Sequence, residues 1–209
     1  MQTRKLRLEK ALSPDEVRAV LAAADRRLTE IDPVRQRAGI FAWVALTTGL
    51  RVSEIARLRL EWFDLDRKLL KVYRHKKHGP NWCKSVPYSG AVEDVITLPD
   101  ALVERIRPIS ESLKGGCEGP LFLTAHGRRA AIRTLFQDWA ELLWEAGVSP
   151  RGCHAARHTF GTLIAVRTRS PFAVRDALGH SDRSIAISAQ YVERNPELVR
   201  ETLNSLFQA

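Results

Sequence analysis

Hydrophobic positions recur at helical spacing along most of the chain. The first such segment follows Ser13-Pro14-Asp15-Glu16, a capping box with proline at the first helical position. Its apolar positions are Val17, Val20, Leu21 and Ala24. Because this spacing places them on one face of a helix, the sequence predicts a helix over residues 14–28.

A second helix is predicted to begin at Asp32-Pro33 and to end at Gly49. Its predicted core face is formed by Ile40, Phe41, Val44 and Ala45. Arg51 follows at once, at the turn before a short helix for which Ser53 is a good N-cap. Glu54 suits the positive end of that short helix, which favours a structural role for its carboxylate.

Five more helices are predicted further along the chain. They cover residues 99–113, 130–146, 154–166, 171–178 and 196–207. The helix over 130–146 has the clearest apolar stripe, formed by Ile132, Leu135, Phe136, Trp139, Leu142 and Leu143. The helix over 196–207 also carries an apolar stripe, which needs a groove to cover it.

Three short segments are predicted to be strands, over residues 62–66, 69–74 and 95–98. The stretch between the last two is longer and richer in glycine and proline than a simple hairpin needs. The predicted fold class is therefore mainly α with a small antiparallel β-sheet (α+β).

The composition limits the kind of partner. The 209 residues suit one domain, predicted over residues 11–209 and preceded by a basic arm over residues 1–10. A net charge of +9 and a pI of about 9.9 favour a polyanionic partner, either nucleic acid or an acidic membrane surface. No apolar run could span a bilayer, and the N-terminus lacks the apolar stretch of a secretory signal. Three cysteines without a C-x-x-C pair favour a reducing cytosol over a disulfide framework or a zinc ribbon.

Four motifs occur in a fixed order. Thr48-Gly49-Leu50-Arg51-Val52-Ser53-Glu54-Ile55 comes first, and His154-Ala155-Ala156-Arg157-His158-Thr159-Phe160 comes second. His154 and Arg157, three residues apart, share one face of a helix. Leu178-Gly179-His180-Ser181 and then Tyr191 follow. Each motif alone is weak, but the ordered set resembles the catalytic domain of the tyrosine recombinases, the phage-integrase family.

The resemblance implies a set of catalytic residues. These are Arg51, Lys76, His154, Arg157, His180 and Tyr191. In the family a lysine lies on a hairpin, and Arg74-His75-Lys76 resembles the corresponding run of many phage integrases. Lys77 is the runner-up and Lys84 the third candidate.

The chemistry explains why such residues are needed. Cleaving a phosphodiester requires fixed positive charge around the phosphorus, because charge grows on its oxygens in the transition state. The carboxylates show no clustered ligand pattern, so neither a metal nor another cofactor is expected, and arginines supply the charge.

In this interpretation Arg51 and Arg157 bind the two non-bridging oxygens, and Tyr191 attacks to form a 3′-phosphotyrosine. By resemblance, His154 is the general base, His180 donates to the phosphate and Lys76 protonates the leaving 5′ oxygen.

The resemblance further implies double-stranded DNA as the partner, a homo-oligomer that is a tetramer on DNA, and a cytoplasmic protein encoded by a bacterium, phage or mobile element. Residues 182–190 are about two residues longer than in many relatives, so Tyr191 could act in its own site or in a neighbour's. Two-domain relatives carry an N-terminal domain that this chain lacks, so we expect either a fragment or a single-domain recombinase.

Two other functions stay open. A type IB topoisomerase uses similar residues, although the motif wording fits recombinases better. A DNA-binding protein without catalysis, either a relic or a regulator of recombination sites, is the alternative from a different class.

Overall fold

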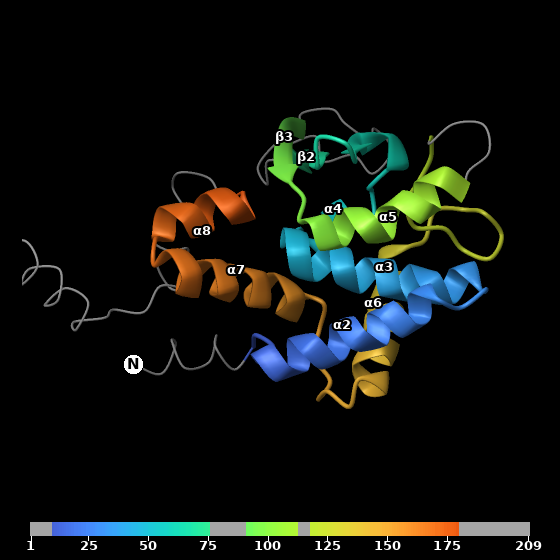
Figure 1. The fold of residues 1–209 in the computed structure, drawn as a ribbon, viewed down its shortest axis with the longest axis horizontal. Helices are drawn as coiled ribbons and strands as arrows, with labels where there is room; N and C mark the ends of the chain where they lie inside the picture. Colours follow the sequence, from blue (N-terminus) through green and yellow to red (C-terminus); the bar gives the residue numbers. More distant parts are fainter. Residues whose placement is uncertain (1–9, 76–90, 113–117, 180–209) are drawn as a thin grey trace, which may run out of the picture. The chain divides into compact units, whose positions relative to one another are not determined.

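The computed structural model describes residues 10–75, 91–112 and 118–179. The chain divides into two compact units, residues 1–160 and 161–209, which are considered separately. The helices are α2 (Pro14–Leu28), α3 (Pro33–Thr48), α4 (Val52–Ile55), α5 (Asp100–Ser112), α6 (Ile132–Glu145), α7 (His154–Thr168) and α8 (Pro171–Leu178). The strands are β1 (Phe63–Asp64), β2 (Leu69–His75) and β3 (Ala91–Thr97), and a 3₁₀ turn, η1 (Leu60–Trp62), precedes β1. The predicted class, mainly α with a small antiparallel sheet, is confirmed (Figure 1).

The first two helices begin and end where local signals place them. The Ser13 hydroxyl accepts the N–H of Glu16, and the Glu16 carboxylate accepts the N–H of Ser13, which completes the capping box of α2. At α3, the Asp32 carboxylate accepts the N–H of Val34 at 2.9 Å. Gly49 ends α3 in the left-handed conformation, with φ of 61°. Both predicted helices are confirmed.

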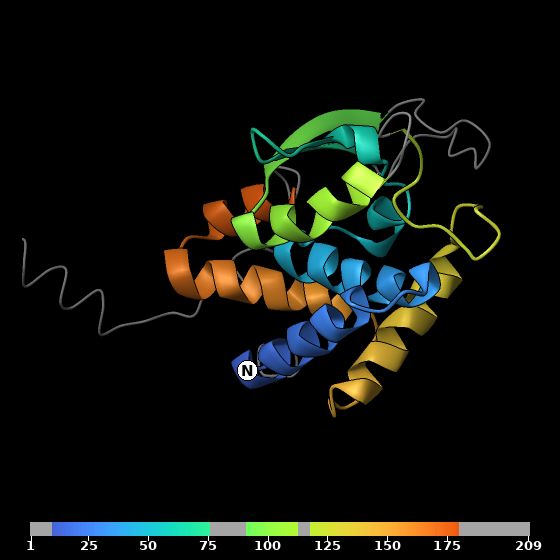
Figure 2. The same cartoon turned by 45° about the vertical axis from the view of Figure 1, so that its right-hand side comes forward.

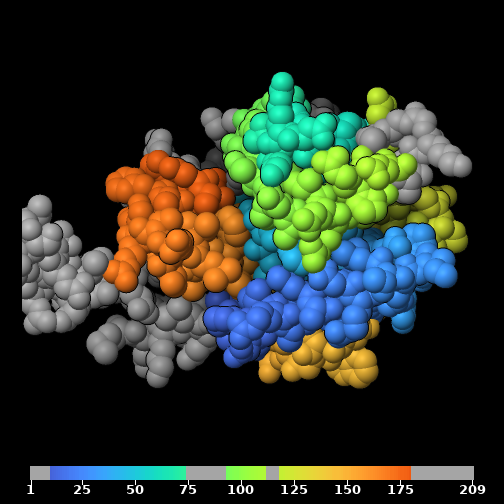
Figure 3. Space-filling view, viewed as in Figure 1, coloured from blue at the N-terminus to red at the C-terminus, as the bar shows by residue number. Residues whose placement is uncertain are grey.

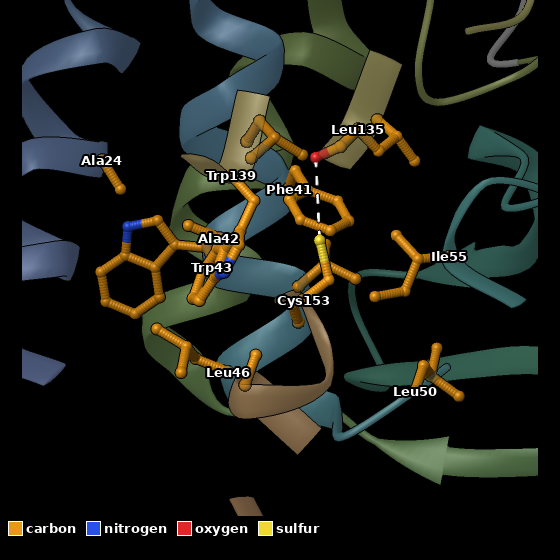
Figure 4. Packing of buried hydrophobic residues seen from close by; sticks show 14 of the residues in the cluster. Ala24, Phe41, Ala42, Trp43, Leu46, Leu50, Ile55, Leu135, Trp139 and Cys153 are labelled. Carbon is orange, nitrogen blue, oxygen red and sulfur yellow. Dashed lines mark hydrogen bonds between the residues drawn. The ribbon is translucent and has the colours of Figure 1, made fainter. Parts of the chain in front are cut away.

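The central helix of the first unit is α3. Figures 1 and 2 show it running between α5 on one side and α2 and α6 on the other. Every residue from Arg37 to Leu46 is buried, so the four predicted core positions are only part of a segment of α3 that is covered on all sides, whereas the first turn of α3 reaches the surface. In Figure 4, Ala24 of α2, Leu135 and Trp139 of α6, and Cys153 surround the α3 side chains. The Phe41 ring packs edge-to-face on Trp139, with centroids 6.3 Å apart.

Arginine side chains tie the outer helices to this central helix, one through an ion pair and one through a cation–π contact. Arg37 of α3 makes a bidentate pair with Asp138 of α6, at 2.7 and 2.8 Å, and both side chains are buried. The Arg105 guanidinium of α5 lies 3.7 Å from the centre of the Trp43 ring. Figure 3 shows the outer faces of α2, α3 and α5 lying side by side on one face of the first unit.

The sheet has the order β1-β2-β3 and is antiparallel throughout. Leu70 and Val72 of β2 are buried, whereas Lys71 between them is exposed, so one face of the strand joins the core. The first predicted strand is confirmed but is shorter than predicted, because Trp62 belongs to a 3₁₀ turn and only Phe63–Asp64 pair with β2. The third begins at Ala91 rather than residue 95, because β3 pairs with the whole of β2 as far as His75.

Two predictions for individual side chains are also wrong. The residue at the N-cap of α4 is Arg51, and Ser53 lies inside this helix, which is only four residues long. Ile132 and Phe136 are 40% and 46% exposed, because α6 is covered only on the face that carries Leu135, Trp139, Leu142 and Leu143. The helix itself runs over Ile132–Glu145, close to the predicted range.

The described part of the second unit contains the end of α7 and the whole of α8. Ser170 caps α8 by accepting the N–H of Ala173, and Gly179 ends it with φ of 60°, so the prediction over 171–178 is confirmed. The helix predicted over 196–207 lies outside the described residues. Across the described ranges, no helix is both long and apolar enough to cross a membrane.

The buried pair of Arg37 and Asp138 provides a test of the fold. Asp138→Ala leaves the Arg37 guanidinium buried without its carboxylate, so we expect the free energy of unfolding to fall by about 3–5 kcal/mol. Asp66→Ala removes the partner of Arg107 in an exposed pair and is the control, with an expected loss of about 0–1 kcal/mol. Chemical denaturation measures both. Equal losses would show that the buried pair does not hold α3 to α6.

Candidate active site

Arg51 is held at the end of the turn between α3 and α4. Its backbone N–H donates to Glu54 Oε2 at 2.7 Å, and its Nη1 donates to Glu54 Oε1 at 3.1 Å. The Glu54 side chain is buried, whereas 43% of the Arg51 side chain is exposed. A buried carboxylate therefore fixes both the backbone and the guanidinium of Arg51 while one side of the guanidinium stays open to solvent. The structure thus supports the predicted structural role of Glu54.

Arg157 lies on α7 and is buried. Its Nη1 donates to the carbonyl oxygen of Gly49 at 2.6 Å, across 108 residues of sequence. Gly49 is separated from Arg51 only by Leu50, so this hydrogen bond brings α7 to the turn that carries Arg51. A Cβ atom on Gly49 would lie 2.2 Å from Cδ1 of Phe160, also on α7, so the close approach requires glycine.

His154 lies at the start of α7, beside both arginines. The surrounding protein desolvates part of the ring and so lowers the pKa of His154, and the positive charges of Arg157 and then Arg51 lower it further. The His158 ring packs edge-to-face against His154, with centroids 5.7 Å apart. The neutral imidazole is therefore favoured near neutral pH, which leaves a lone pair that can accept a proton.

The neighbouring Cys153 does not form a second reactive group. Its Sγ is buried and lies 3.9 Å from the carbonyl oxygen of Leu135, as Figure 4 shows. Burial raises the pKa of Cys153 to about 12, so the thiol stays protonated. Across residues 10–75, 91–112 and 118–179, no three His, Cys, Asp or Glu side chains gather as they would around a metal ion.

Three of the six predicted site residues are therefore brought together, namely Arg51, His154 and Arg157. The other three, Lys76, His180 and Tyr191, lie outside the described residues, as do Lys77 and Lys84. Two of these residues directly follow a described element in the sequence. Lys76 directly follows the last residue of β2, and His180 directly follows Gly179 at the end of α8.

Comparison with known sequences decides the family. The profile described as the phage integrase family matches residues 10–197, which is nearly all of the chain. The chain belongs to the phage integrase family.

Named relatives of this phage-integrase chain are tyrosine recombinases. The chain is 30% identical over 202 residues to tyrosine recombinase XerD of Staphylococcus aureus, and the match covers 95% of this chain and 62% of that protein. It is 30% identical over 190 residues to a XerC-like tyrosine recombinase of Caldanaerobacter subterraneus, covering 78% of this chain and 48% of that protein. The integrase-family chain thus spans about half to three-fifths of the length of these relatives.

The fold of this phage-integrase chain also matches solved structures. A XerH site-specific recombinase bound to difH substrate superposes with a TM-score of 0.72, at 21% identity, over 96% of this chain and 55% of that one. The likeness extends the match from sequence to the arrangement of the helices and the sheet.

Sequence reasoning missed two contacts that assemble this integrase-family site. The first is the approach of Phe160 to Gly49, and the second is the hydrogen bond from Arg157 to the Gly49 carbonyl. The sequence marked Gly49 only as a helix end, and no local pattern indicates what packs against a helix end from 108 residues away.

Gly49→Ala tests this contact. The new methyl group would meet Phe160, and alanine would be strained at φ of 61°, so we expect a loss of about 2–4 kcal/mol in the free energy of unfolding. Gly147→Ala is the matched control, because Gly147 also has positive φ (67°) but a Cβ added there would meet no atom within 4 Å. The control should lose only about 1–2 kcal/mol, measured by denaturation. The contact is unimportant if the two variants lose the same amount.

The lowered pKa of His154 gives a second prediction. Arg51→Gln removes one positive charge near the ring, so the pKa of His154 should rise toward the ordinary value of about 6.5. Arg57→Gln removes another arginine charge just beyond α4 and should leave this pKa unchanged. Histidine NMR titration measures both, with the signal assigned from His154→Asn. If the pKa of His154 does not change in Arg51→Gln, the Arg51 guanidinium lies too far from the His154 ring to affect its proton.

The same pKa affects stability in one direction. Because the unfolded chain binds the His154 proton more tightly, the fold loses stability as the pH falls from about 6.5 toward the lowered pKa.

Proposed function

We propose that this chain carries the strand-cleaving centre of a site-specific DNA recombinase, which acts in the cytoplasm on double-stranded DNA. The observation that carries the proposal is the convergence of two arginines and a neutral histidine from the two longest motifs of the family. Guanidinium groups match phosphate oxygens bidentately and keep their charge at every physiological pH. They can therefore stabilise a phosphorane without a metal ion.

The proposed reaction exchanges one phosphate ester for another. The Tyr191 oxygen attacks phosphorus, its proton passes to neutral His154, and the bond from phosphorus to the 5′ oxygen breaks. Lys76 protonates the leaving 5′ oxygen, and Arg51, Arg157 and His180 hold the phosphate oxygens. A 5′ hydroxyl from another strand can reverse the step, because the 3′-phosphotyrosine bond preserves the ester.

The two arginines have different tasks in this scheme. Arg157 is buried and donates to the Gly49 carbonyl, which holds its guanidinium in place beside the turn that carries Arg51. Arg51 is partly exposed, so it meets the incoming phosphate first. Preorganised donors of this kind need little rearrangement as charge develops.

A basic surface near α6 supports DNA as the partner. Arg128 and Arg129 lie on the exposed turn before α6, and Arg133 lies in its first turn. Among the described residues, none of these three forms an ion pair, so their charges are available to phosphates. The XerH recombinase, whose fold resembles that of this chain, was solved bound to difH substrate, which is consistent with this proposal.

We further propose that the chain works as a homo-oligomer, a tetramer on DNA. Recombination exchanges strands between duplexes, so at least two cleaving centres must lie close together. The apolar stripe predicted from the sequence over residues 196–207 would suit a contact between copies, since an amphipathic helix needs a surface that covers its apolar face.

A nicked duplex from which the cleaved fragment diffuses away tests the proposal. The chain should form a covalent protein–DNA adduct in the presence of a chelator, seen as a band of higher mass on a denaturing gel. Tyr191→Phe should bind the duplex but form no adduct, because only the nucleophilic oxygen is lost. Tyr73→Phe is the control and should form the adduct, because Tyr73 packs on Trp62 of the sheet region.

Other outcomes favour other functions. An adduct with Tyr191→Phe would show that another residue is the nucleophile. A gel shift without any adduct would favour a DNA-binding protein that does not cleave. Relaxation of supercoiled DNA without a preferred site would favour a topoisomerase.

A further inference from the structure

The segment that leads into α2, together with the first turn of α2, is docked on the segment that carries His154 and Arg157. We call residues 11–16 the N-terminal strap. The Arg151 guanidinium makes a bidentate pair with Glu16, at 2.8 Å for each hydrogen bond, and also donates to the carbonyl oxygen of Ala11 at 2.9 Å. The Leu12 N–H donates to Thr159 Oγ1 at 2.8 Å. Arg151 lies just before α7 and Thr159 lies within it, so the strap contacts the chain on both sides of His154 and Arg157.

Thr159 connects the strap to the backbone of α7. Its hydroxyl accepts the Leu12 N–H and donates to the carbonyl oxygen of Ala155 at 2.8 Å, so both its donor and an acceptor position are used. The side chain is only 1% exposed, and Ala11 and Leu12 are buried as well. Without this hydroxyl the buried Leu12 N–H would have no acceptor, so the strap would have to move or leave a polar group unpaired.

The strap and Gly49 hold opposite faces of α7. Thr159 lies two residues after Arg157, which corresponds to about 200° around a helix of 3.6 residues per turn. Arg157 is held by the Gly49 carbonyl, and Thr159 is held by Leu12. Two contacts on opposite faces fix the rotation of a helix about its own axis, which one contact cannot do.

Small rotations of α7 matter for the site. A guanidinium or imidazole lies several ångströms from the helix axis, so a turn of about 10° displaces it by about 1 Å. A displacement of this size can change the rate of a reaction about a hundredfold.

We infer that the N-terminal strap is a positioning element, and that Thr159 and Glu16 act through α7 and Arg151 to set where His154 and Arg157 stand relative to Arg51. The expected change in reaction rate rests on the proposed function. The pKa of His154, which responds to the distance of the two arginines, can be measured without DNA. Neither Thr159 nor Glu16 touches the reacting atoms in the proposed reaction.

The test compares Thr159→Val, Thr159→Ser and Glu16→Gln. Valine keeps the shape of threonine but cannot accept the Leu12 N–H, whereas serine can. Glu145→Gln is the matched control, because it weakens the ion pair with Arg27 between α6 and α2, away from α7. All variants are the full chain, held at a temperature where denaturation curves show each to be folded.

Two quantities are measured on each variant. The first is the His154 signal in an NMR titration without DNA, and the second is the rate of adduct formation with the nicked duplex at increasing DNA concentration. In Thr159→Val we expect the His154 pKa to shift and the maximal rate to fall about tenfold, with the half-saturating DNA concentration unchanged. Thr159→Ser should restore both, Glu16→Gln should show a smaller effect in the same direction, and Glu145→Gln should change neither.

The inference is overturned if Thr159→Val leaves the His154 titration and the maximal rate at the values of the unmodified chain. It is also overturned if Glu145→Gln lowers the rate as much as Thr159→Val, because the rate would then follow stability alone. Should Thr159→Val fail to fold, Glu16→Gln decides by the same two measurements. If the unmodified chain forms no adduct, the proposed function fails, and the His154 titration alone decides whether the strap positions α7.

Discussion

The burial of the Arg157 guanidinium is the constraint on which the site depends. A buried cation needs hydrogen-bond acceptors, and the Gly49 carbonyl supplies one at 2.6 Å. That bond requires the start of α7 to lie against the end of α3, where only glycine leaves room for Phe160. The left-handed turn at Gly49 then directs the chain to Arg51, whose position is fixed by buried Glu54. Two arginines distant in sequence thereby share one small region with His154.

The rest of the first unit keeps that region in place. The end of α3 can serve as a reference point because residues 37–46 of α3 are all buried, and the Arg37–Asp138 pair ties the helix to α6. The strap restrains α7 from the face opposite Arg157. Rigid helices hold donors more accurately than loops do, which suits a site that must bind charge as it develops.

Local signals explain which parts of the fold could be predicted. The capping box at Ser13, the proline after Asp32 and the glycines at 49 and 179 act within a few residues, so helix ends were predicted well. The start of β3 was predicted four residues too late, because it depends on pairing with β2. The exposure of Phe136 depends on what covers α6, which periodicity cannot show. The site residues came from motif order, whereas their supports, Gly49 with Phe160 and Thr159 with Leu12, are contacts between distant segments that no local pattern encodes.

The central claim is that Arg51, His154 and Arg157 serve one phosphate. A crystal structure of the full chain with Tyr191→Phe, bound to an uncleaved duplex target, tests it most directly. We expect the non-bridging oxygens of a single phosphate to lie about 3 Å from both guanidiniums, with the His154 ring beside the same phosphate. Arginines bound to two different phosphates, or an Arg157 that contacts only protein carbonyls, would contradict it.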